Sequence, residues 1–149
     1  MNSIIIDRVL KKHCPIYHGV FASDNLPDLG LSTRRPLVLV ANTDPKRRPG
    51  KHWICMYFNE YGDGEYFDSL GLKPLDCFKR YMTVQCIRWT YNKKQLQSII
   101  SKFCGHYCMW YCMMKFRKVS LYELLRNISN DTGLNDFLIH RFACKLLLV

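Results

Sequence analysis

Three cysteines recur at intervals of four residues in the segment SKFCGHYCMWYCMMKF, which spans positions 101–116: Cys104, Cys108 and Cys112. This interval places them on one face of a helix. Eight residues of helix at about 1.5 Å each separate Cys104 from Cys112 by about 12 Å. One zinc ion binds thiolates at about 2.3 Å and cannot bridge that gap. No metal site is therefore predicted, and Cys108 and Cys112 are interpreted as small apolar core residues.

Cys104 differs from the other two because it stands at the start of the predicted helix, which runs to about Arg117 and has His106 as its only polar residue before the basic end. Free backbone N–H groups and the helix dipole at this end favour negative charge and lower the pKa of a thiol. The next residue, Gly105, has no side chain to crowd an incoming substrate. Cys104 is thus a candidate nucleophile.

A thiolate nucleophile needs a base, and the base needs a group that orients it. His52 opens the apolar stretch HWICMYFN, and Asp68 lies at the end of the following EYFDS, with the turn sequence EYGDG between them. A tight hairpin returns its second strand to the end where its first strand began. His52 and Asp68 are therefore predicted to lie near each other and to form a catalytic set with Cys104.

Acyl transfer by a cysteine also needs donors for the oxyanion that forms on the attacked carbonyl. The backbone N–H of Cys104 is predicted to be one donor. A side-chain amide is the usual second donor, and Gln97, Gln95 and Gln85 are all candidates on spacing alone. The bulky side chains of Trp53 and Tyr107 are expected to narrow the substrate cleft.

The elements that must position these residues mix helices and strands without regular alternation. A loop is expected over 15–36, and Pro74 is expected near the first turn of a short helix. Helices are predicted over 2–13, 73–82, 120–129 and 135–148, and strands over 36–43, 52–59, 65–69 and 84–90. The fold class is predicted to be α+β, with a mixed, mostly antiparallel sheet packed on a central buried helix.

The composition suits one globular domain covering residues 1–149, with a formal net charge of +10. Eight cysteines without a secretory signal favour reduced thiols and an intracellular protein. The apolar runs are shorter than the roughly 20 residues of a membrane span, so no membrane association is predicted. The scattered basic clusters suit either a polyanion such as DNA or a merely solubilising surface.

The catalytic candidates and their neighbours resemble the adenain family of adenovirus-type cysteine endopeptidases, which are relatives of the SUMO-specific proteases. The resemblance rests on HW at the start of a strand, YFDSLG, a glutamine, and CGHYC. It implies that His52 is the base, Asp68 the orienting acid and Cys104 the nucleophile. It selects Gln97 as oxyanion donor, because the family's glutamine stands seven residues before the cysteine. The LQS and GLNDFLIHRF segments are most similar to proteases of Maverick/Polinton transposons and adintoviruses.

The resemblance implies a cysteine endopeptidase that matures viral or transposon capsid precursors near small residues such as glycine, in the nucleus or virion of an infected cell. Trp53 and Gly105 are expected to contact substrate. No cofactor is required, but activation by DNA or a viral peptide is an expectation. Asp68 stands where adenovirus enzymes have Glu, so a deubiquitinase or deSUMOylase is the first alternative. The charge alone suggests a second, a non-catalytic nucleic-acid-binding module.

Overall fold

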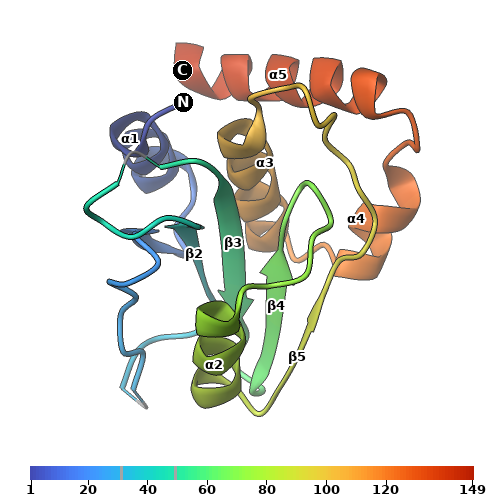
Figure 1. The fold of residues 1–149 in the computed structure, drawn as a ribbon. Coiled ribbons are helices and arrows are strands. Elements are labelled where there is room, and N and C mark those ends of the chain that lie inside the picture. The colour runs from blue at the N-terminus through green and yellow to red at the C-terminus, as the bar shows by residue number, and fades with distance from the viewer. Residues whose placement is uncertain (31, 49) are drawn as a thin grey trace.

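A five-stranded sheet with helices on both faces forms the centre of the molecule (Figure 1). The computed structural model describes residues 1–30, 32–48 and 50–149. The strands lie in the sheet in chain order, with β3 in the middle. They are β1 Tyr17–Phe21, β2 Leu37–Asn42, β3 Trp53–Phe58, β4 Asp63–Phe67 and β5 Arg88–Tyr91.

The sheet is mixed, and the α+β class is confirmed, but antiparallel pairs are not in the majority. The β2–β3 and β3–β4 pairs are antiparallel, whereas β1 pairs with β2 and β4 pairs with β5 in parallel. The loop predicted over 15–36 contains β1, so that part of the prediction is wrong. Its glycines and prolines suggest a loop, but pairing with the buried strand β2 supplies the backbone hydrogen bonds that make 17–21 a strand.

The helices are α1 Ser3–His13, α2 Asp76–Gln85, α3 Cys104–Phe116, α4 Leu121–Asn127 and α5 Thr132–Leu148. Helix α4 begins with a side-chain cap, since the Ser120 hydroxyl accepts from the Glu123 N–H at 3.1 Å. Helix α2 begins two residues after Pro74 and continues to Gln85, so the strand predicted over 84–90 is shortened to β5. Within the described ranges, none of these helices has both the length and the apolar character that a membrane span requires.

Two hydrophobic cores lie on opposite faces of the sheet. Helices α1, α3 and α5 cover one face and meet side chains that include Val38, Val40, Cys55 and Phe67. Helix α2 covers the other face, where Phe78 and Met82 join a second core. Helix α3 is the central buried helix of the prediction, because it contacts β2, β3, α1 and α5. Cys108 and Cys112 are 1% and 0% exposed, which confirms that they are core residues.

Candidate active site

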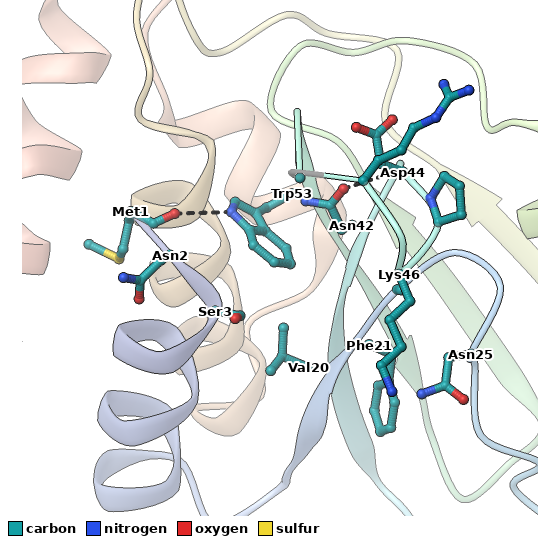
Figure 2. A pocket seen from close by; sticks show the side chains of 14 residues that line it. Met1, Asn2, Ser3, Val20, Phe21, Asn25, Asn42, Asp44, Lys46 and Trp53 are labelled. Atoms are coloured by element: carbon teal, nitrogen blue, oxygen red, sulfur yellow. Dashed lines mark hydrogen bonds between the residues drawn. The ribbon is translucent and has the colours of Figure 1, made fainter.

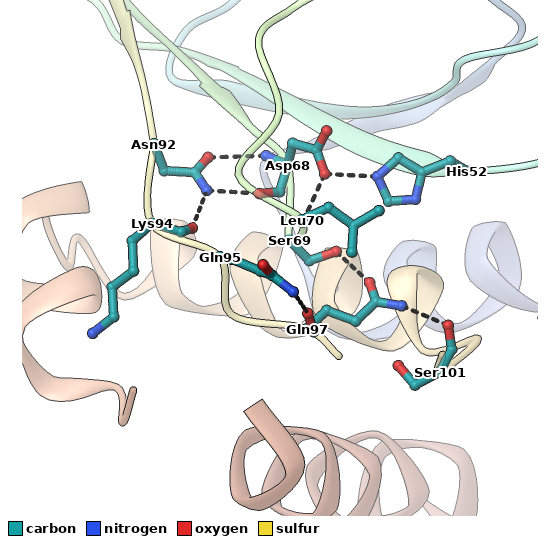
Figure 3. Close-up of polar contacts among 9 residues, drawn as sticks. All are labelled: His52, Asp68, Ser69, Leu70, Asn92, Lys94, Gln95, Gln97 and Ser101. Carbon is teal, nitrogen blue, oxygen red and sulfur yellow. Dashed lines mark hydrogen bonds and ion pairs between the residues drawn. The ribbon is translucent and has the colours of Figure 1, made fainter. Parts of the chain in front are cut away.

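His52 and Asp68 are in direct contact where β3 begins and β4 ends, as the hairpin pattern predicts. His52 lies immediately before β3 and Asp68 immediately after β4, and Cys55 of β3 pairs with Phe67 of β4. The His52 Nε2 and Asp68 Oδ1 atoms are 2.6 Å apart (Figure 3). Asp68 Oδ1 also accepts from the backbone N–H of Leu70 at 2.8 Å. The carboxylate thus holds Nε2 and leaves Nδ1 as the nitrogen available to a thiol.

Asn92 fixes the backbone of Asp68 from the neighbouring chain segment. Its Oδ1 accepts from the Asp68 N–H at 2.9 Å, and its Nδ2 donates to the Asp68 carbonyl at 2.6 Å (Figure 3). Asn92 directly follows β5, so its side-chain amide continues the pairing of β4 and β5 beyond the end of the ladder. It is 1% exposed. The acid that orients His52 therefore rests on a rigid backbone.

Cys104 is the first residue of α3, and its thiol and the His52 imidazole lie close enough to shift each other's pKa. Burial raises the pKa of Cys104, but hydrogen bonds from His52 and from the backbone N–H groups of Trp53 and Gly105 outweigh it, and the pKa falls below its ordinary 9.0. Burial lowers the pKa of His52, whereas its bonds to Asp68 and Cys104 raise it, with a net pKa of about 9. Both shifts favour a thiolate–imidazolium pair at neutral pH.

The Gln97 side chain contacts the residues that lead into α3. Its Oε1 accepts from the Ser69 hydroxyl at 2.6 Å, and its Nε2 donates to the Ser101 carbonyl at 3.0 Å (Figure 3). These two bonds fix the orientation of a side chain that is only 2% exposed. Ser101 stands three residues before Cys104, so the amide N–H₂ group is directed toward the start of α3. Its second N–H has no acceptor among the described residues and can serve as a donor.

The two rival glutamines are occupied elsewhere. Gln95 Nε2 donates to the Gln97 carbonyl at 2.9 Å, and its side chain is exposed, whereas that of Gln97 is buried. Gln85 ends α2, and its Oε1 accepts from the Leu29 N–H at 3.2 Å. The role of Gln97 as oxyanion donor stays a prediction.

Three further residues were expected near the substrate, and each has different surroundings: Trp53, Gly105 and Tyr107. Trp53 is half-buried, and its Nε1 donates to the Met1 carbonyl at 3.2 Å. A Cβ at Gly105 would lie 3.2 Å from Ile6 and 3.3 Å from Met1, so the glycine admits α1 to the start of α3. Tyr107 is 0% exposed and cannot narrow a cleft, which corrects the expectation from its size.

The sequence analysis missed Ser69 and Asn92, which hold Gln97 and Asp68 in place. Both are common polar residues without a motif of their own. Only their places in the sequence, next to the predicted acid and near the end of a predicted strand, could have indicated their roles. Ser69 directly follows the predicted acid, and Asn92 lies two residues after the predicted strand over 84–90, where a side-chain amide can replace a missing strand partner.

The chain is similar in sequence to one known cysteine protease. No protein-family model matches the chain. It is 28% identical over 131 aligned residues to the cysteine protease S273R of African swine fever virus, an alignment covering 76% of this chain and 47% of the viral protein. The chain therefore spans about half the length of this curated relative.

Two solved structures show the same architecture. The crystal structure of the African swine fever virus pS273R protease matches with a TM-score of 0.68 at 19% identity, over 93% of this chain and 66% of that one. The SUMO protease Ulp1 matches with a TM-score of 0.55 at 14% identity, over 99% of this chain and 78% of that one. This is the SUMO-protease-like cysteine protease fold. The predicted fold is thereby confirmed, whereas the narrower likeness to transposon and adintovirus proteases stays a prediction.

Proposed function

We propose that the protein is a cysteine endopeptidase in which His52, Asp68, Gln97 and Cys104 carry the reaction. The observation that carries this proposal is the contact set at one edge of the sheet. There, the imidazole of His52 lies 2.6 Å from a carboxylate and lowers the pKa of the Cys104 thiol, which stands at a helix start. This arrangement supplies a nucleophile, a proton carrier and an orienting acid. The similarity in sequence to a viral cysteine protease supports the same activity.

In the proposed mechanism, the Cys104 thiolate attacks the peptide carbonyl carbon and forms a C–S bond. The resulting oxyanion accepts hydrogen bonds from the Cys104 backbone N–H and the Gln97 amide. The His52 imidazolium donates its proton to the leaving amine as the C–N bond breaks, which leaves a thioester. His52 then takes a proton from water, the hydroxide attacks the thioester, and the thiolate leaves.

We propose that the substrate peptide extends into a cavity of about 450 Å³ beside Trp53 (Figure 2). Asn42 is 4% exposed and lines this cavity, and its Nδ2 has no hydrogen-bond partner among the described residues. Nor does Asp44 Oδ2, a buried acceptor on the same wall, within that part of the chain. An unpaired donor and an unpaired acceptor match the N–H and C=O groups of an extended peptide.

The substrates are proposed to be precursor proteins of a virus or transposon, such as capsid precursors, cut near small residues in the nucleus or virion. The basic surface supports a further proposal, that DNA stimulates the enzyme. The exposed side chains of Lys46, Arg47, Arg48 and Lys51 lie in the segment that joins β2 to His52. A polyanion bound to them would act on the chain directly before the base.

A peptide library with glycine-rich and other sequences tests the activity, with cleavage sites mapped by mass spectrometry with and without duplex DNA. We expect cleavage that is lost in Cys104→Ala and kept in Cys144→Ala, since Cys144 is a half-exposed cysteine away from His52. Stimulation by DNA should weaken as salt increases. Cleavage that persists in Cys104→Ala, or that never occurs with or without DNA, would refute the proposal.

The fold shared with the SUMO protease Ulp1 is the observation that favours a second candidate, an isopeptidase acting on ubiquitin or SUMO. Ubiquitin and SUMO carrying a C-terminal fluorophore distinguish the two. An endopeptidase should hydrolyse the best library peptide with the higher kcat/KM. Faster hydrolysis of either folded modifier would make the isopeptidase the correct assignment. DNA binding without any Cys104-dependent hydrolysis would instead favour the nucleic-acid-binding module.

A further inference from the structure

The segment that carries Gln97 has no regular structure of its own. Residues 92–103 contain neither helix nor strand, so side chains from elsewhere must set the path of the backbone. One support comes from the end of β4, where the Ser69 carbonyl accepts from the N–H groups of Leu96 and Gln97, both at 2.9 Å. This contact holds the segment on one side only.

Helix α5 holds the same segment from the other side. The Asn135 Nδ2 donates to the Leu96 carbonyl at 3.1 Å, and both carboxylate oxygens of Asp136 lie 3.4 Å from the Ser98 N–H. The residues immediately before and after Gln97 are therefore bound by two successive residues of one helix. A shift of α5 would move the backbone that carries the amide.

Tyr107 joins α5 to the helix that begins with the nucleophile. Its hydroxyl lies 2.8 Å from Asp136 Oδ1 and 3.2 Å from the Leu96 carbonyl. A hydroxyl donates one proton at a time, and the closer, charged carboxylate is the favoured acceptor. Tyr107 stands three residues after Cys104 on α3. The nucleophile's helix, the Gln97 segment and α5 thus meet at one hydroxyl group.

The burial pattern of α5 is the reverse of an ordinary amphipathic helix at this point. Asn135 and Asp136 are 1% and 7% exposed, whereas Leu134, Phe137 and Leu138 are 45%, 56% and 50% exposed. Burying polar groups costs free energy unless they are hydrogen-bonded. Here the bonds go to the Gln97 segment, to Tyr107 and, from Asn135 Nδ2 at 2.8 Å, to the Ser129 carbonyl. The two polar residues face inward because of the backbone that they hold.

We propose that Tyr107, Asn135 and Asp136 are positioning residues that set the place of the Gln97 amide, so that α5 controls oxyanion stabilisation without touching substrate. This inference rests on the proposed function. It predicts a loss in kcat with little change in KM, because the oxyanion forms only during acyl transfer. It also predicts no change in alkylation of Cys104 by iodoacetamide, in which the sulfur displaces iodide and no oxyanion forms.

Tyr107→Phe tests the proposal, with Tyr111→Phe as the matched control. Tyr111 lies one turn further along α3, is equally buried, and donates its hydroxyl proton to Glu65 Oε1 at 2.7 Å, away from the Gln97 segment. We expect kcat to fall about 10-fold in Tyr107→Phe and to stay within about twofold of the parent in Tyr111→Phe. The iodoacetamide rate of Cys104 should be unchanged in both variants. Equal effects of the two substitutions on kcat would overturn the proposal.

Asp136 supplies a conservative pair of variants. Asp136→Asn keeps an oxygen that can accept from Tyr107, and Asp136→Ala keeps none, so kcat should be substantially recovered in the first relative to the second. Hydrogen exchange of the peptide spanning 92–103 gives a readout that needs no turnover. It should speed up in Tyr107→Phe and Asp136→Ala but not in Tyr111→Phe. If the parent protein hydrolyses nothing, the proposed function fails, and unchanged exchange in these variants would independently refute the positioning role.

Discussion

Cys104 and Cys108 stand one turn apart on the same helix, are both largely buried, and have opposite chemistry. Burial raises the pKa of Cys108 to about 11, while the pKa of Cys104 falls below its ordinary value. Burial acts on Cys104 in the same direction, but hydrogen bonds from His52 and from backbone N–H groups outweigh it. The two thiols are the same residue type and are both buried, so neither property explains the difference in their pKa. The position at the helix start and the neighbouring imidazole do.

The largest expected effect is the difference in peptide hydrolysis between a variant without the Cys104 thiol and a variant without the Cys108 thiol. Cys104→Ala is expected to reduce peptide hydrolysis by about 10⁴-fold or more, since it removes the nucleophile itself. Cys108→Ala should leave kcat within a few-fold of the parent. Steady-state rates on the best library peptide, with both variants checked for folding by circular dichroism, provide the measurement. Comparable losses in the two would show that α3 has no single reactive thiol.

Loss of the oxyanion donor should give the next largest effect. Gln97→Ala is expected to lower kcat by about 10²–10³-fold while iodoacetamide still alkylates Cys104 at the parental rate, because only acyl transfer forms an oxyanion. Gln95→Ala is the matched control and should change kcat much less, since its amide faces the Gln97 carbonyl. A fall in the alkylation rate of Gln97→Ala would mean that the side chain supports the thiol instead.

The pH dependence follows from the two shifted pKa values. The thiolate is lost as pH falls through the pKa of Cys104, which lies below 9.0. The imidazolium is lost as pH rises through the pKa of His52, about 9. We therefore expect kcat/KM to form a bell, with a decline of about tenfold per pH unit above about pH 9. A rate that keeps rising above that pH would contradict the role of His52 as proton donor.

The smallest expected effect concerns stability. Cys108→Ala should lower the free energy of unfolding by about 1 kcal/mol, because it removes one buried sulfur from the core between α3 and β3. Cys104→Ala at the helix start should cost no more than that. Urea denaturation of both variants provides the comparison. A larger loss for Cys104→Ala would indicate that the residue is chiefly structural.

Much of the site could be predicted because its residue types are chemically specific. A histidine and an aspartate at the open end of one hairpin must lie close together, and His52 and Asp68 do. A cysteine at a helix start is by itself usually structural, and only together with His52 and Asp68 does Cys104 indicate a nucleophile. Ser69 and Asn92 carry no such signal, because their roles depend only on which backbone groups they meet.

The fold was predicted where local patterns decide the structure and missed where distant pairing does. The central strands and α3 are marked by long apolar runs and agree with the prediction. Strand β1 and the parallel attachment of β5 depend on crossover connections, which leave no local pattern. The inward-facing Asn135 and Asp136 are equally invisible, because polar residues on a helix ordinarily indicate its exposed face.

The most direct test of the central claim is residue-resolved alkylation by iodoacetamide across a range of pH, quantified by mass spectrometry for each of the eight cysteines. We expect Cys104 to be alkylated selectively near neutral pH with an apparent pKa below 9.0. His52→Ala should raise that pKa above the ordinary value, because burial then acts without the imidazole. Alkylation of Cys104 at the same rate as the half-exposed Cys77 and Cys144, and unchanged by His52→Ala, would contradict the assignment of Cys104 as the activated nucleophile.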